Sequence, residues 1–546
     1  MTPYRHVADA LEDVAGRRGR NAKVARLAEA LVGAGEDDLP AAARFLAGSA
    51  FAEHEAATTS AGWATIVAAA REVTGWDEET LGACAGAIGD VGEAVALLLP
   101  TEAPEGPSVA DANAFFRGLS SARKAAEKRA LLAAILKRSS GVEAKYLLKT
   151  LSGGLRVGAD LTTVEEAIAA AFGRSRDEVA RAHRDCGDIG ETAVAAKQGR
   201  LGEIRFRLFH PIGFMLASPI ESAEEVAEEL SGFAVEDKFD GIRAHAHKEG
   251  ERVALFSRTL DDVTNQFPDV AEALSALPGT FLLDGEILAW KGDRAESFFK
   301  LQRRLGRKAP EAELLEEIPA AFVAYDCLAV GEETLFEAPW SARREALERL
   351  AADGALRLSE VRTAKSPSEL EELFTAARER GNEGLVLKER DSLYQAGRRG
   401  RAWRKWKKAL ATLDVVVTAV EQGHGKRAGM LSDYTFAVRG EDGFVNIGKA
   451  YSGLTDEEIR RMGTIFRGLT TARYGPVRAV EPKIVIEVSF DSIQPSARHR
   501  SGFALRFPRI VRLREDKPAG EIATLEDVRA IYARLTGAPG GQAPGP

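Results

Sequence analysis

Apolar residues recur at helical spacing through the first third of the chain, from residue 1 to about residue 205. The segments VEEAIAAAFG at 164–173 and DEVARAHRDC at 177–186 place apolar side chains three and four positions apart, which is the repeat of one helix face. Runs of β-branched residues are few in this region. The pattern therefore predicts an all-α domain over residues 1–205.

Short β-rich runs alternate with helical stretches between residues 206 and 410. The runs are RVALFSR at 252–258, TFLLDGEILAW at 280–290, AAFVAYDCLAV at 320–330 and EGLVLKE at 383–389. Each has the length and the composition of a strand. This alternation predicts an α+β domain over residues 206–410.

Strand and turn signals dominate from residue 411 to about residue 520, as in TLDVVVTAVEQG at 412–423, YTFAVRG at 434–440 and KIVIEVSFDSIQ at 483–494. Several short strands of this kind predict a compact β-barrel of the OB-fold type. Residues 521–546 combine a short helix, LEDVRAIYARL at 525–535, with a tail rich in glycine and proline that cannot support a core. We expect this tail to be mobile.

Composition fits a multidomain protein of three to four domains, since the chain has 546 residues and domains commonly span ~100–200. The three cysteines are far apart and form no C-x-x-C pair, so neither a disulfide framework nor a cysteine zinc site is predicted. The N-terminus lacks the apolar core of a signal peptide, and no run of ~18 apolar residues occurs. We expect a cytoplasmic protein without a membrane partner.

The net charge of −8 hides local blocks of positive charge. Seven basic residues occur in the eleven positions from Arg398 to Lys408, and five in the nine positions from Lys300 to Lys308. A further basic stretch runs from Arg498 to Lys517. Such blocks concentrate positive potential where a polyanion can lie, although each block alone is also compatible with a solvated charged face.

The string EDKFDGIRAHAH, which begins at Glu236, places one lysine among charged residues. Gly241 allows a close backbone approach beside it. The amine of Lys238 would be protonated on a surface, where a lysine pKa is ~10.4. In a pocket that gathers other cations, a lysine can lose its proton and act as a nucleophile. On its own, K-x-D-G is weak support for catalysis.

Six further motifs follow in a fixed order: FSRT at 256–259, LLDGEILAW at 282–290, FVAYD at 322–326, EGLVLK at 383–388, WRKWKK at 403–408 and RFPRIVRLREDK at 506–517. The series resembles that of the covalent nucleotidyltransferases. Almost the full chain is similar to the three-domain ATP-dependent DNA ligases, including EAKYLLKTLSGGLRVGADLTTVEEAIAAAF at 143–172, which is similar to their DNA-binding-domain signature. The resemblance implies a helical DNA-binding domain, an adenylation domain and an OB-fold domain.

The resemblance also implies roles for individual residues around ATP. Lys238 is the expected nucleophile, and Glu286 and Glu383 are the expected ligands of Mg²⁺, with Glu286 also near the ribose. Arg243 and Arg258 are expected to hold ribose or phosphate oxygens through their forked donors. The alternative for these charged side chains is that each forms a structural ion pair with no role in catalysis.

Further positions are expected to bind the nucleotide. Tyr325, where the family usually has phenylalanine, would stack on adenine, and Glu236 would contact the adenine region. Lys405 and Lys407 share one face of a strand and, with Arg399, would contact the α-phosphate, while Trp406 points toward the core. Arg514 and Lys517 would close over ATP and orient pyrophosphate.

The resemblance predicts an ATP-dependent DNA ligase that uses Mg²⁺ and seals nicked duplex DNA as a monomer encircling its substrate, near the nucleoid of a bacterium or archaeon. RNA ligation and GTP-dependent capping share the lysine chemistry and remain alternatives, although the helical domain of about 200 residues argues against both. A catalytically silent DNA clamp is a more remote alternative. The four-cysteine zinc module of NAD-dependent ligases is missing from the sequence.

Overall fold

A computed structural model describes the chain except residues 56, 58, 60, 89, 104, 293, 297, 308, 408–410, 424–426, 428, 475–476, 497 and 537–546. It forms two compact units, Met1–Trp76 with Val95–Lys407 and Asp77–Ala94 with Lys408–Pro546. The Gly/Pro tail beyond residue 536 and the expected domain boundary at 410 lie outside the described residues. Among the described helices, none combines the length and the apolar content that crossing a bilayer requires.

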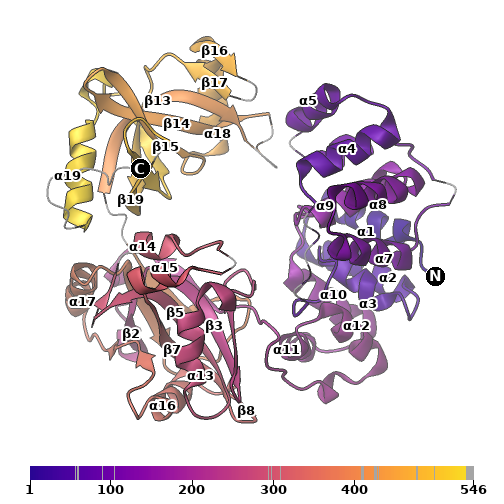
Figure 1. Ribbon diagram of the computed structural model, residues 1–546, viewed down its shortest axis with the longest axis horizontal. Helices are drawn as coiled ribbons and strands as arrows, with labels where there is room; N and C mark the ends of the chain where they lie inside the picture. The colour runs from indigo at the N-terminus through magenta and orange to yellow at the C-terminus, as the bar shows by residue number, and fades with distance from the viewer. Residues whose placement is uncertain are drawn as a thin grey trace. The chain divides into compact units, whose positions relative to one another are not determined.

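The N-terminal region is helical, as predicted (Figure 1). Its helices are α1 (Tyr4–Gly16), α2 (Arg20–Gly33), α3 (Leu39–Leu46), α4 (Trp63–Thr74), α5 (Glu78–Ile88), α6 (Val91–Ala96), α7 (Val109–Ser121), α8 (Ala125–Arg138), α9 (Gly141–Leu151), α10 (Leu161–Phe172), α11 (Arg176–Cys186) and α12 (Ile189–Gln198). Local sequence sets the ends of α11, because the Ser175 hydroxyl accepts the Glu178 N–H and Gly187 adopts a φ of +64°.

Of these helices, α5 and the start of α6 belong to the second unit, and two sheets form the rest of the first unit. One has the strand order β1-β12-β11-β2-β10, with β1 (Leu216–Ile220), β12 (Arg399–Trp406), β11 (Gly384–Glu389), β2 (Phe233–Lys238) and β10 (Val361–Arg362). The other has the order β4-β3-β5-β7-β8, with β4 (Arg252–Ser257), β3 (Ile242–Glu249), β5 (Phe281–Lys291), β7 (Ala320–Val330) and β8 (Glu333–Thr334). Two short strands extend it, β6 (Arg294–Ala295) beside β5 and β9 (Arg357–Leu358) beside β7.

Helices cover these sheets and complete their cores. They are α13 (Pro268–Ser275), α14 (Phe298–Gln302), α15 (Ala312–Glu317), α16 (Trp340–Leu350) and α17 (Pro367–Glu379). Phe374 of α17 packs on the buried Trp406 of β12, with ring centroids 4.5 Å apart. Trp406 therefore points into the core, as its place between two lysines predicts.

Sheet register brings the motifs together. Lys238 at the end of β2 is paired with Gly384 of β11, and Lys405 of β12 is paired with Val386 of β11. In the second sheet, Arg243 of β3 is paired with Glu286 of β5. Residues far apart in the sequence are thus neighbours on two sheets.

The second unit is built mainly of strands. Its larger sheet contains β13 (Ala411–Gln422), β14 (Leu431–Gly440), β15 (Gly443–Ala450), β16 (Thr470–Tyr474), β17 (Val477–Val480), β18 (Val485–Phe490) and β21 (Arg509–Leu513). A smaller sheet pairs β19 (Ser492–Pro495) with β20 (Phe503–Arg506), and two helices, α18 (Asp456–Gly468) and α19 (Leu525–Thr536), pack on the core.

The larger sheet curls because the long strand β13 has two successive partners along one edge. Its first half pairs with β18, and its second half pairs with β17. The chain after β15 also approaches β21, where the Ile510 N–H donates to the Ser452 carbonyl at 2.9 Å. A side chain at Gly453 would lie 1.9 Å from the carbonyl oxygen of Ile510, so this approach requires glycine. The sheet has the curl of a half-barrel.

Candidate active site

Lys238 lies at the end of β2, beside the carboxylate of Glu383. Its Nζ is 2.6 Å from the Glu383 carboxylate, and the Glu383 N–H donates to the Lys238 carbonyl at 2.8 Å. Both side chains are about one-quarter exposed, so a ligand can reach them. Gly241 fits tightly here as expected, since a Cβ would lie 2.5 Å from the Ile287 carbonyl oxygen.

Two carboxyl groups next to Lys238 have opposite pKa shifts. Burial raises the pKa of the half-buried Glu286 to about 8, against the opposing effects of Lys238 and Arg243. For Glu383 burial acts in the same direction, but the charge and hydrogen bond of Lys238 outweigh it and lower the pKa. The site thus holds one carboxylate and one carboxyl that is mainly protonated at neutral pH.

A group of cations surrounds Lys405 of β12. Burial lowers the pKa of the Lys405 ammonium, and four neighbouring positive charges lower it further. These charges belong to Arg399, Lys238, Lys407 and Arg258. Lys407 also lies 3.9 Å from the Glu383 carboxylate. The structure therefore gathers five of the predicted cations in one place, which suits the phosphates of a nucleotide.

Arg243 has structural partners that the sequence does not predict. Its guanidinium donates to both oxygens of the buried Asp284, at 3.0 and 2.6 Å, and to the Met215 carbonyl at 2.7 Å. Asp284 also accepts from the Tyr394 hydroxyl at 2.8 Å. Ribose or phosphate contact by Arg243 is thus left to its two remaining N–H groups.

Glu236 and Tyr325 share a buried partner, Lys388, which the sequence analysis missed. The Lys388 ammonium lies 3.0 Å from Glu236 Oε1, donates to the Tyr325 carbonyl at 3.1 Å and lies 4.4 Å from the Tyr325 ring centroid. Lys388 and Glu236 are 1% and 2% exposed, so the ion pair is fully enclosed. Lys388 ends the motif EGLVLK, and that position is the signal that could have identified it.

Arg514 and Lys517 lie in the second unit, where Asp414 of β13 holds both. Arg514 Nη1 is 2.9 Å from each Asp414 oxygen, and Lys517 Nζ is 2.7 Å from one of them. Asp516 accepts two more hydrogen bonds from Arg514 at 2.9 Å. The two predicted pyrophosphate ligands therefore share one carboxylate that sequence analysis did not single out.

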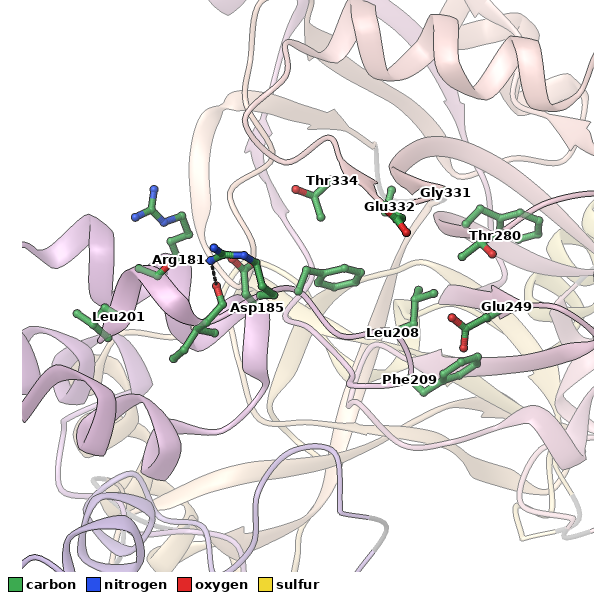
Figure 2. A pocket seen from close by; sticks show the side chains of 16 residues that line it. Arg181, Asp185, Leu201, Leu208, Phe209, Glu249, Thr280, Gly331, Glu332 and Thr334 are labelled. Atoms are coloured by element: carbon green, nitrogen blue, oxygen red, sulfur yellow. Dashed lines mark hydrogen bonds between the residues drawn. The ribbon is translucent and has the colours of Figure 1, made fainter. Parts of the chain in front are cut away.

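A cavity of about 630 Å³ in the first unit lies among other residues (Figure 2). Its walls come from α11, the segment 201–209 and the turns at the ends of β3, β5 and β7, with Arg181, Asp185, Glu249 and Glu332 among the lining side chains. None of the predicted site residues lines this cavity. We place the candidate active site at Lys238, where Glu383 and the group of cations lie.

The side chains around Lys238 are those needed to transfer a nucleotidyl group through a lysine. The amine can attack a phosphorus atom, and the two carboxyl groups can hold a divalent cation. The ring can stack on a base, and the group of cations can neutralise phosphates. This arrangement defines the class of the protein as a covalent nucleotidyltransferase.

Comparisons with known families cover most of the chain. The family model described as "ATP dependent DNA ligase domain" matches residues 214–407. Two other family models match, "DNA ligase N terminus" over residues 3–169 and "ATP dependent DNA ligase C terminal region" over residues 427–517. A probable DNA ligase of Koribacter versatilis is 45% identical, with 96% of each chain covered. A DNA ligase of Thermococcus onnurineus is 34% identical, with 89% of this chain and 90% of its own covered. The chain belongs to the ATP-dependent DNA ligase family.

A solved structure, Pmar-Lig_PreS3, has a TM-score of 0.61 and covers 93% of this chain and 99% of its own. Its sequence is 16% identical, so the match concerns the fold alone. Together with the family matches, it agrees with the predicted multidomain architecture, which begins with a helical region and continues with curled sheets.

Proposed function

We propose that this DNA ligase seals nicks in duplex DNA in three steps, with Lys238 as the nucleophile. Lys238 Nζ attacks the α-phosphorus of ATP, forms lysyl-AMP and expels pyrophosphate. The AMP then moves to the 5′-phosphate of the nick, and the 3′-hydroxyl attacks that phosphate and expels AMP. The observation that carries the proposal is the contact between Lys238 and Glu383 beside the group of cations.

Nucleotide binding would use the residues around Lys238. Tyr325 would stack on the adenine, and Glu236, although enclosed with Lys388, would contact the adenine region. Arg399, Lys405 and Lys407 would neutralise the α-phosphate, while Arg258 and the remaining N–H groups of Arg243 would hold ribose or phosphate oxygens. The observed proximity of these charges to Lys405 and Glu286 supports this assignment.

Glu286 and Glu383 would hold Mg²⁺. Magnesium in phosphoryl-transfer sites is commonly bound by one or two carboxylates together with substrate phosphates, and it neutralises charge on the transferring group. The negative charge of Glu383 contributes to the raised pKa of Glu286, and this closeness of the two carboxyl groups supports the donor set. A cation between them would favour the ionised form of Glu286.

We assign the helical residues 1–205 to DNA binding, 206–410 to adenylation and 411–520 to an OB-fold domain. The protein would act as a monomer that encircles DNA. Arg514 and Lys517 would orient pyrophosphate in the first step, after release from Asp414. Their shared carboxylate supports the idea that both cations act together.

Labelled ATP and nicked DNA test the proposal directly. The protein should become labelled with AMP in the presence of Mg²⁺, and the label should pass to a nicked duplex that carries a 5′-phosphate. Labelling by GTP instead of ATP would favour the capping alternative. Sealing of nicked RNA in preference to DNA would favour RNA ligation, and failure to label at all would favour a binding protein.

A further inference from the structure

Two arginines face each other in the β16–β17 hairpin of the second unit. Arg473 of β16 and Arg478 of β17 are directly opposite in the antiparallel register. Side chains at such positions lie on the same face of a sheet, with Cβ atoms about 4.5–5.5 Å apart, and like charges there are destabilising. The hairpin therefore keeps two positive charges together at a cost to its own stability.

A third arginine completes this group. Arg467 lies in the last turn of α18, just before β16. Partial loss of hydration and the positive charges of Arg473 and Arg467 lower the pKa of Arg478, so both of these arginines lie near the Arg478 guanidinium. We call Arg467, Arg473 and Arg478 the arginine patch.

The arginine patch has no carboxylate partner within the part of the chain that the structure describes. The neighbouring carboxylates already have other partners, since Glu421 pairs with Lys449 at 2.8 Å and Glu481 pairs with Lys483 at 2.9 Å. The side chains of Arg467 and Arg473 are exposed, and Arg478 is half-buried. Interaction with the helix dipole explains a cation at Arg467 but not the pair on the hairpin.

We propose that the arginine patch binds the phosphodiester backbone of the duplex that flanks the nick. Arginines are common donors to DNA phosphates, and such contacts position a protein without reading sequence. Three cations on adjoining elements, with no carboxylate partner among the described residues, have the charge complementary to a polyanion. This inference rests on the proposed function, because it takes nicked duplex DNA as the partner.

Salt dependence of DNA binding tests the contact. We compare the variant Arg473→Ala/Arg478→Ala with the wild type, using fluorescence anisotropy of a labelled nicked duplex between low and high KCl. Each lost phosphate contact reduces the slope of log K against log salt by about 0.9, so we expect a reduction of about 1.8 and weaker binding at every salt concentration. Lysyl-AMP formation, which needs no DNA, should stay at the wild-type rate.

A matched control removes two other arginines from the same unit. Arg461 is exposed and pairs with Glu515 at 2.8 Å, and Arg529 is half-buried and pairs with Glu526 at 3.2 Å. The variant Arg461→Ala/Arg529→Ala changes the net charge by the same amount but should keep the wild-type slope. Tyr474→Ala alters the same hairpin without changing its charge and should also keep the slope.

The variant Arg473→Glu separates binding from stability. It replaces a repulsive cross-strand pair with an attractive one, so the melting temperature should rise while affinity for the nicked duplex falls. A purely structural patch would not show these opposite changes. The inference is overturned if Arg473→Ala/Arg478→Ala keeps the wild-type slope and affinity, which would leave another anionic partner such as an acidic protein.

The wild-type measurements keep the two proposals apart. A wild type that forms lysyl-AMP and seals nicks, combined with an unchanged slope in the double variant, would overturn the arginine patch alone. A wild type that binds DNA but forms no lysyl-AMP would overturn the proposed function, while the slope would still report on the patch.

Discussion

At the residue scale, the two carboxyl groups beside Lys238 differ in protonation although both are partly enclosed. Glu383 has the lysine ammonium 2.6 Å away, and this contact outweighs the effect of burial on its pKa. For Glu286, burial outweighs the opposing charges of Lys238 and Arg243, and the pKa rises to about 8. Neither effect can be read from sequence, because each depends on the sheet register that places the groups together.

The raised pKa of Glu286 predicts a pH dependence of stability in the nucleotide-free and metal-free protein. A carboxyl whose pKa in the folded protein exceeds its ordinary value of 4.5 stabilises the fold below pH 4.5. This stabilisation is lost as the pH rises from 4.5 through about 8. The melting temperature should therefore fall across this range, and Glu286→Gln should remove this part of the fall. Thermal melts at several pH values measure it. As a control, Glu316→Gln at an exposed position should show the same dependence of melting temperature on pH as the wild type. The prediction is contradicted if Glu286→Gln also shows the wild-type dependence.

The buried pair of Lys388 and Glu236 predicts strong coupling between two substitutions. Lys388→Met leaves a buried carboxylate without its cation, which should lower the free energy of unfolding by ~3–5 kcal/mol. In a Glu236→Gln background the same change should cost much less, because no charge is left unpaired. Urea unfolding of the four proteins gives the coupling energy. Equal losses in both backgrounds would show that the ion pair does not carry the effect.

At the element scale, sequence patterns predicted the strands well. The run AAFVAYDCLAV at 320–330 has the same bounds as β7. The run RVALFSR at 252–258 extends one residue beyond the end of β4. Continuous β-rich runs bounded by turns identify such strands from local sequence. Partners across strands could not be predicted in this way, which is why Asp284, Lys388 and Asp414 were missed as partners of the predicted residues.

Arg514 and Lys517, which follow β21 and contact Asp414 of β13, lead to a prediction about one step of the reaction. The leaving pyrophosphate in the first step carries several negative charges, whereas AMP leaves the last step with fewer. Arg514→Ala with Lys517→Ala should therefore slow lysyl-AMP formation, by ~2–4 kcal/mol in the barrier for each lost contact, and largely spare closure of a pre-adenylylated nick. Single-turnover rates of the two half-reactions measure this. Arg529→Ala is the control for removal of an arginine, and equal slowing of both steps would instead favour a DNA-facing role.

At the scale of the whole molecule, Lys238 and the residues proposed to act around it lie in the first unit, whereas Arg514 and Lys517 lie in the second unit. The ordered motifs made the family predictable from sequence because each motif combines a chemically required side chain with a strand or turn that positions it. The arginine patch was not predictable in the same way, since Arg467, Arg473 and Arg478 form no motif and become neighbours only through the hairpin register.

The central claim is that Lys238 carries AMP between ATP and DNA. The most direct measurement compares Lys238→Ala with the wild type in two assays, AMP labelling of the protein from ATP and closure of a nick that already carries 5′-AMP. We predict that the variant forms no lysyl-AMP, because the side chain that makes the covalent bond is lost, yet still closes the pre-adenylylated nick at a reduced rate. ATP-dependent sealing by Lys238→Ala at the wild-type rate would contradict this account.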